Sequence, residues 1–131
     1  MCNKYIGLYR FTKIVDTTEG EVPIPNDDGS TTCTLQISTG NNNLNQYDIG
    51  IKIGNSMGGS ATITPTTNQG IIDDVITIGG LRSTMMMPPP ELYRIEVALS
   101  KLLPSATNIQ IEDFVLTIVG SKGSVQAIRQ V

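Results

Sequence analysis

Histidine and tryptophan are absent from this chain of 131 residues, and cysteine occurs only twice. Without histidine the chain cannot form a Ser-His or Cys-His nucleophile, and it lacks both the usual general base at neutral pH and a common zinc ligand. The adjacent acids Asp73 and Asp74 do not replace it, because neighbours on a strand point to opposite faces. We therefore expect no enzyme, no catalytic residue, no metal and no cofactor.

One acidic turn leaves a second reading open. Within a turn, Asp27 and Asp28 can supply oxygens to Ca²⁺, or they can simply bond to their own backbone in contact with solvent. We favour the solvated turn, in which the aspartates make local hydrogen bonds.

Charged residues are also scarce, at 16% of the chain, and nine Lys and Arg face twelve Asp and Glu. Binding to nucleic acid depends on clustered basic residues, and those of this chain are scattered, so we expect no nucleic-acid partner. No apolar run approaches the ~20 residues that cross a bilayer, which argues against direct membrane insertion. The first residues show no signal peptide, so we expect the protein to be synthesised and released in a cytoplasm, which for a viral protein is that of the host.

The two cysteines can form at most one disulfide. Cys33 lies in the stretch TCTLQI, where alternation places it on one face with Leu35 and Ile37. This pattern favours a buried, unreactive thiol at Cys33. Pairing between Cys33 and Cys2 remains the alternative.

Apolar residues alternate with polar ones along most of the chain, which is typical of half-buried strands. We expect all of residues 1–131 to form one domain, an all-β, single-domain β-sandwich of jelly-roll-like form with about eight strands. The stretch GNSMGGS is expected to be a turn, a bulge or bend is expected around Glu112 and Asp113, and a hairpin turn is expected at Gly120–Gly123. The expected strands cover residues 5–15, 32–38, 47–53, 61–66, 73–78, 92–99, 109–119 and 125–131. The expected core residues are Ile49, Ile51, Ile53, Ile95, Val97, Phe114, Leu116 and Ile118.

Three methionines run directly into three prolines at residues 85–90. Prolines lack the N–H that a central strand needs, so this run is expected at an edge, a corner or a crossing between sheets. Methionine adapts to imperfectly matched surfaces. The candidate subunit interface is therefore Met85, Met86, Met87, Pro88, Pro89 and Pro90, with an irregular corner of the core as the alternative.

Four segments between Tyr47 and Gly120 resemble, in pattern and order, the jelly-roll penton and minor capsid proteins of icosahedral, tectivirus-like bacteriophages. They are YDIGIKIGNSMGGSATITP, TNQGIIDDVITIGG, LRSTMMMPPPELYRIEV and IQIEDFVLTIVG. The resemblance implies a homo-oligomer, a ring of five, that binds the major capsid protein and resides in the virion.

The leading hypothesis is accordingly a virion structural protein of penton, minor capsid or decoration type. The alternative is a carbohydrate- or receptor-binding module of a spike or tail fibre, although aromatic residues make up only 5% of the chain and sugar-binding surfaces use aromatic faces. A subunit of an extracellular filament would need an export route that the first residues do not show.

Overall fold

The structure is a computed structural model that describes residues 5–22, 33–40, 46–53, 56–64, 74–79, 81–83 and 90–130. In this part of the chain, ten strands, one α-helix and a short 3₁₀ turn follow one another. The elements are β1 (Gly7–Asp16), β2 (Gly20–Val22), β3 (Thr34–Thr39), β4 (Gln46–Lys52), β5 (Ser56–Thr64), β6 (Asp74–Ile78), β7 (Arg82–Ser83), α1 (Pro90–Leu102), the 3₁₀ turn (Leu103–Ser105), β8 (Ala106–Glu112), β9 (Val115–Gly120) and β10 (Gly123–Arg129).

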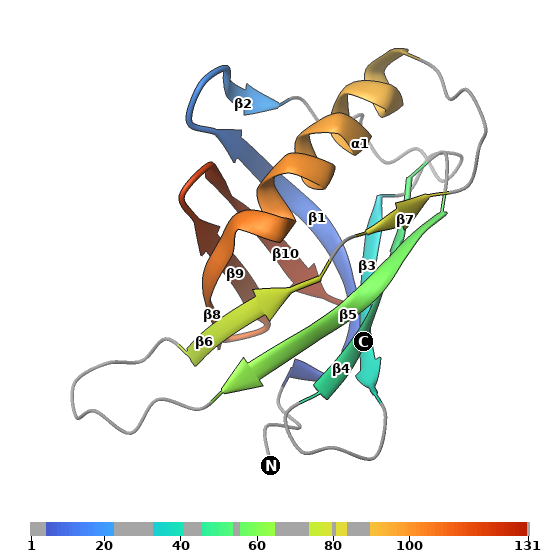
Figure 1. Cartoon of the computed structure of the whole chain (residues 1–131), viewed down its shortest axis with the longest axis vertical. Helices are drawn as coiled ribbons and strands as arrows, with labels where there is room; N and C mark the ends of the chain where they lie inside the picture. The colour runs from blue at the N-terminus through green and yellow to red at the C-terminus, as the bar shows by residue number, and fades with distance from the viewer. Residues whose placement is uncertain are drawn as a thin grey trace.

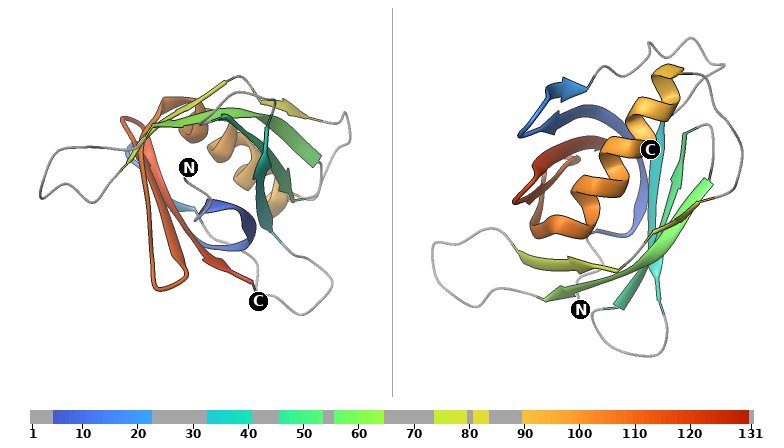
Figure 2. Two further views of the ribbon diagram at one scale, coloured as in Figure 1. Left: turned by 90° about the horizontal axis from the view of Figure 1, so that it is seen from below. Right: turned by 45° about the horizontal axis from the view of Figure 1, so that its top comes forward.

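The strands form one antiparallel sheet that closes on itself. Eight of them pair in the cyclic order β1, β10, β9, β8, β6, β5, β4, β3 and back to β1, while β2 and β7 add to β1 and β5. The closing ladder between β1 and β10 runs from Tyr9 opposite Arg129 to Asp16 opposite Gly123. Figure 2 (left) shows the strands surrounding the molecule's interior.

The prediction of a jelly-roll-like sandwich is therefore wrong, although the strands themselves are present. Alternation along a strand shows that one face is buried. It does not show whether that face packs against a second sheet or lines the inside of a closed one. Here the pairing of β1 with β10 joins the two edges that the single sheet would otherwise leave open.

The inward faces of the strands fill the barrel with apolar side chains, as an eight-stranded barrel allows. Among the expected core residues, Val97 and Phe114 are wrong, since their side chains are 48% and 57% exposed. The other six are buried, namely Ile49, Ile51, Ile53, Ile95, Leu116 and Ile118.

Helix α1 occupies residues 90–102, where we expected a strand over 92–99. Its buried residues Leu92, Ile95, Leu99 and Leu102 recur at intervals of three and four, which places them on one helix face. Val97 lies on the opposite face and is exposed. Proline suits the first position of a helix, where its missing N–H is not needed, and Pro90 is that residue. The helix crosses the upper end of the barrel, as Figures 1 and 2 show.

The turns confirm one expectation and correct two. A turn joins β9 to β10 within Gly120–Gly123, as predicted. Glu112 instead ends β8, and Asp113 and Phe114 form a tight turn to β9 in which both residues have positive φ, 52° and 69°. The expected glycine-rich turn is wrong for residues 56–60, which belong to β5.

Cys33 directly precedes β3 and is a buried, free thiol, which confirms that interpretation. Its burial raises the pKa of the thiol above the ordinary value, because the charged thiolate is poorly solvated there. No helix in the described part of the chain has both the length and the apolar character needed to cross a membrane.

Candidate functional site

Most of the site residues proposed from sequence lie outside the residues that the structure describes. These are Met85, Met86, Met87, Pro88 and Pro89, together with the acidic pair Asp27 and Asp28. Pro90 is described as the first residue of α1. Among the described residues, two polar clusters and a groove are candidates for a site.

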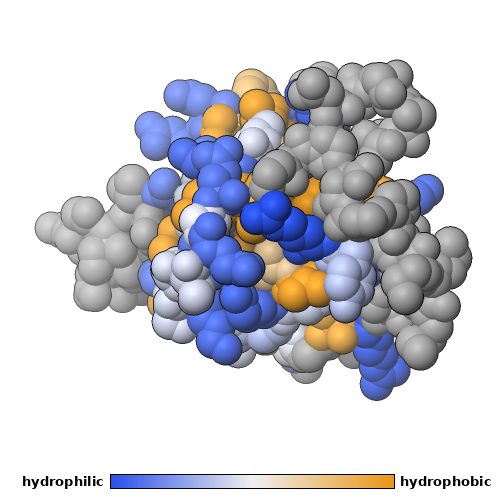
Figure 3. Space-filling model, turned by 90° about the horizontal axis from the view of Figure 1, so that it is seen from above, coloured by the Kyte–Doolittle hydropathy of each residue, from blue (hydrophilic) through white to orange (hydrophobic). Residues whose placement is uncertain are grey.

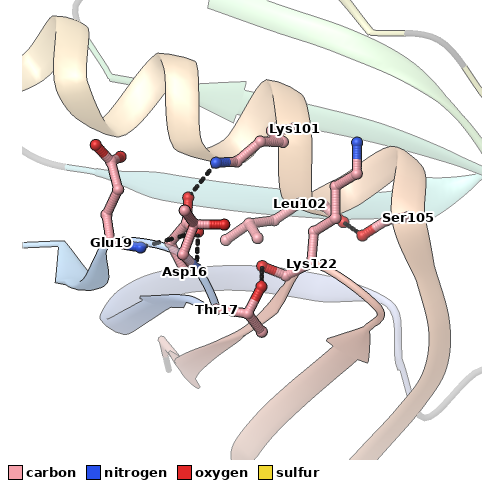
Figure 4. A network of polar contacts seen from close by, with 8 residues as sticks. Asp16, Thr17, Glu19, Lys101, Leu102, Ser105 and Lys122 are labelled. Carbon is pink, nitrogen blue, oxygen red and sulfur yellow. Dashed lines mark hydrogen bonds and ion pairs between the residues drawn. The ribbon is translucent and has the colours of Figure 1, made fainter.

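A polar cluster at the upper end of the barrel joins the end of β1 to the end of α1 (Figure 4). The carboxylate of Asp16 is almost fully buried and forms an ion pair with the ammonium group of Lys101. Its other oxygen accepts hydrogen bonds from the backbone N–H groups of Thr18 at 2.7 Å and Glu19 at 3.4 Å. Both carboxylate oxygens are thus engaged.

The same contacts lower the pKa of Asp16 below its ordinary value of 3.8. The hydrogen bond from Lys101 has the largest effect and that from the Thr18 N–H the next, while burial acts in the opposite sense. A carboxylate held in this way is a poor general base, because its oxygens already have donors and its protonated form is disfavoured. The cluster fastens α1 to the barrel.

A second cluster lies within the barrel around the beginning of β1. The hydroxyl group of Tyr5 donates a hydrogen bond to the carboxylate of Asp74, and both side chains are buried. The hydroxyl group of Tyr9 donates to the carbonyl oxygen of Tyr5 at 2.7 Å, and the guanidinium group of Arg129 lies 5.6 Å from the Tyr9 ring centroid. These contacts hold residues before β1 against β6 and β10, and burial closes them to a substrate.

The third feature is a groove on the outer wall of the barrel, over β1, β3, β4 and β5, with a volume of about 320 Å³. This volume is at the lower end of the range found for small-molecule sites. Strand pairing brings its residues together, since Leu8 lies opposite Gln36 and Gln36 opposite Gly50, while Thr34 lies opposite Lys52 and Lys52 opposite Ser56. The residues that line the groove are Leu8, Thr34, Gln36, Gly50, Ile51, Lys52, Ser56 and Met57, of which Ile51 and Met57 are buried.

The floor of the groove is low at Gly50, which has no side chain and faces outward beside a second glycine on the neighbouring strand. Gly50 on β4 lies opposite Gly58 on β5. A Cβ atom at Gly50 would meet nothing within 4 Å, and one at Gly58 would meet only the carbonyl oxygen of Ile49, at 3.6 Å. The fold therefore has room for a side chain at both positions. Glycine inside a strand weakens it and often marks a place where a ligand approaches the backbone.

Apolar side chains are also exposed outside the groove. Exposed apolar residues occur on several elements, for example Val75 on β6, Tyr93 on α1 and Phe114 between β8 and β9. Seen from above, the described hydrophobic side chains lie in small groups among hydrophilic ones (Figure 3). Scattered exposed residues of this kind are ordinary on soluble domains.

Among the described residues, no group of three or more His, Cys, Asp or Glu side chains is placed to hold a metal ion. The outer-wall groove is therefore the candidate functional site. Sequence reasoning missed it because its residues come together only through strand pairing and because GNSMGGS was interpreted as a turn. The signal was present in the pattern YDIGIKI, where Gly50 takes an outward position of a strand.

These observations define a closed antiparallel β-barrel with a helix across one end and a groove on its outer wall. A model of the META domain matches residues 7–131, and the chain belongs to the META domain family. A solved structure described as the NMR structure of a protein from Burkholderia xenovorans has a similar fold, with a TM-score of 0.62 over 95% of this chain and 82% of that chain. The two sequences are 14% identical, so the likeness concerns the fold alone. Among curated proteins, none matches this chain.

The family corrects the classification that the sequence pattern suggested. The description of the chain as a jelly-roll capsid protein of a virion is replaced by that of a META domain barrel. The segments between Tyr47 and Gly120 match both patterns because alternation marks strands and not the order in which they pair.

Proposed function

We propose that this META domain is a non-catalytic binding module and that the outer-wall groove is its ligand site. The observation that carries the proposal is the groove itself, a hollow of about 320 Å³ lined in part by Gly50, where the fold has room for a side chain. Because Gly50 has no side chain, the strand backbone there is open to a ligand, while Thr34 and Gln36 offer hydrogen-bonding groups around it.

The polar clusters elsewhere support a binding role over a catalytic one. Asp16 is held by Lys101 and two backbone donors, and Asp74 is buried against Tyr5. A general acid or base must reach the proton that it transfers. Both carboxylates instead connect elements of the barrel, so the groove contains no described carboxylate among its lining residues.

Backbone amide chemical shifts of the ¹⁵N-labelled protein test the proposal. The probes are hexanoate, hexanamide, hexylamine and maltose, which differ in charge and polarity. At least one probe is expected to shift the amide signals of Gln36, Gly50 and Gly58 in a saturable way. Gly50→Val should abolish these shifts by filling the floor, because the position has room for a side chain and a β-branched residue suits a strand.

Ser124→Val provides the matched control, since Ser124 is half-buried on β10 and does not line the groove. It should leave the shifts unchanged. A thermal melt of each variant shows that it is folded. The proposal is overturned if no probe shifts the groove signals, or if folded Gly50→Val binds as well as the unchanged protein.

A further inference from the structure

We infer that the ligand of this groove carries a carboxylate beside a short aliphatic chain, with Lys52 binding the carboxylate and Leu8 contacting the chain. This inference rests on the proposed function of the groove and names the class of molecule that it takes. Three observations lead to it: the charge of the surrounding wall, the state of Lys52 and the position of Leu8.

The wall around the groove has the opposite charge balance to the whole chain. Over the entire sequence, acidic residues outnumber basic ones by twelve to nine. On β1, β3, β4, β5 and β7, Asp48 is an exposed acid and Asp16 is buried in its ion pair with Lys101. The basic residues on these strands are Arg10, Lys13, Lys52 and Arg82. This concentration of basic residues favours an anion over a neutral or cationic ligand.

Lys52 is the basic residue that lines the groove directly. Its side chain is exposed, and the structure shows no ion pair or hydrogen bond for it within the described residues. Asp48 is four positions earlier on the same strand, which places it roughly 13 Å away along β4. The ammonium group of Lys52 is thus available to a ligand, and the hydroxyl group of Thr34, opposite Lys52 on β3, can donate to the same anion.

Leu8 lies two strands away from Lys52, on the other side of the groove. Its side chain is 44% exposed, so part of its apolar surface remains in water. From strand spacing, the two Cα atoms are roughly 12 Å apart. A ligand that covers Leu8 and reaches Lys52 therefore needs an apolar part and a negative end. A small aliphatic carboxylate has both.

Titration of the ¹⁵N-labelled protein with hexanoate and with hexanamide tests the inference, because the two probes share the chain and differ in charge. Hexanoate is expected to bind more tightly than hexanamide. Raised salt should weaken the binding of hexanoate but not that of hexanamide. Lys52→Gln should lower the affinity for hexanoate by up to about fivefold, as for an exposed charge pair. Lys52→Arg should restore most of it. Leu8→Ser should lower the affinity for both probes.

Lys122→Gln is the matched control, since it removes the same charge in the turn between β9 and β10, away from the groove. It should not change hexanoate binding. Equal binding of the two probes at Gln36, Gly50 and Gly58 would overturn the carboxylate inference and leave the groove as a binding site. If neither probe shifts these signals but maltose or hexylamine does, the carboxylate inference fails while the proposed binding function stands. If no probe shifts them, the proposed function fails as well.

Discussion

Two glycines of this barrel lie in opposite surroundings. Gly123 begins β10 with a φ of +155°, and a Cβ atom built there would lie 2.1 Å from the carbonyl oxygen of Val15 and 2.5 Å from a methyl group of Leu102. Gly50 has neither restriction. Glycine is therefore required by packing at the closing ladder, whereas in the outer-wall groove it is not.

At this residue scale, Gly123→Ala is expected to lower the free energy of unfolding by at least about 2 kcal/mol, because the backbone of β1 must move away from the new methyl group. Gly50→Ala should be neutral or stabilising by up to about 1 kcal/mol, since alanine reduces the freedom of the unfolded chain. Urea unfolding curves of both variants measure the difference. A Gly123→Ala variant as stable as Gly50→Ala would contradict the close approach of β10 to β1.

At the scale of the element, α1 shows where local pattern is ambiguous. Ile95, Val97 and Leu99 alternate as a strand does, while Leu92, Ile95 and Leu99 also satisfy helical spacing. The residues between these positions include both polar and apolar side chains, and the charged residue Glu96 is buried. Seven or eight residues of such sequence fit both periods. The position of the segment across the barrel end favours the helix, and the local sequence pattern does not encode that position.

Single substitutions on the two faces of α1 test its placement. Ile95→Ala should cost about 2–5 kcal/mol of stability, because it empties a fully buried position. Val97→Ser should change stability by no more than about 0.5 kcal/mol, because the side chain is 48% exposed. Thermal or urea unfolding provides the measurement. Comparable losses of stability from both substitutions would contradict the helix and favour the strand that alternation predicts.

The contact that fastens α1 to β1 should make stability depend on pH. The pKa of Asp16 lies below its ordinary value of 3.8 in the folded protein. Its contribution is therefore fully present above that ordinary value and is lost as the pH falls through the lower, folded value. Urea midpoints between about pH 7 and about pH 2.5 measure the loss.

The variant Asp16→Asn should be less stable than the unchanged chain at neutral pH, and the difference should shrink on acidification. Lys122→Gln serves as the control, because the side chain of Lys122 points away from Asp16 (Figure 4). An unchanged difference across the whole range would mean that the carboxylate charge is not what holds α1.

At the scale of the whole molecule, the closed sheet should unfold as one unit. Removing any strand of the ring opens ladders on both of its sides. Cys33 reports on this directly, because its thiol is buried beside β3 and its raised pKa keeps it protonated. In a Cys2→Ser background, labelling of Cys33 by a thiol reagent should rise with urea in parallel with loss of the far-UV CD signal. Rapid labelling without urea would contradict a closed, cooperative barrel.

The sequence predicted the strands better than their assembly. The alternation of Tyr47, Ile49 and Ile51 identified β4 and its buried face, because side-chain direction is a local property of a strand. The pairing of β1 with β10 depends on residues more than a hundred positions apart, and no local pattern encodes it. The groove was missed for the same reason, since Leu8, Gln36 and Gly50 come together only through pairing.

The ladder between β1 and β10 also has a consequence for how the chain is made. Tyr9 pairs with Arg129, which lies 120 positions later in the sequence. A ribosome releases the chain from its N-terminal end, so β1 must wait with an unpaired edge until β10 has emerged. Contacts so distant in sequence close slowly, and an open edge is prone to aggregate meanwhile. Slowing translation between β1 and β10 should therefore lower the yield of soluble protein.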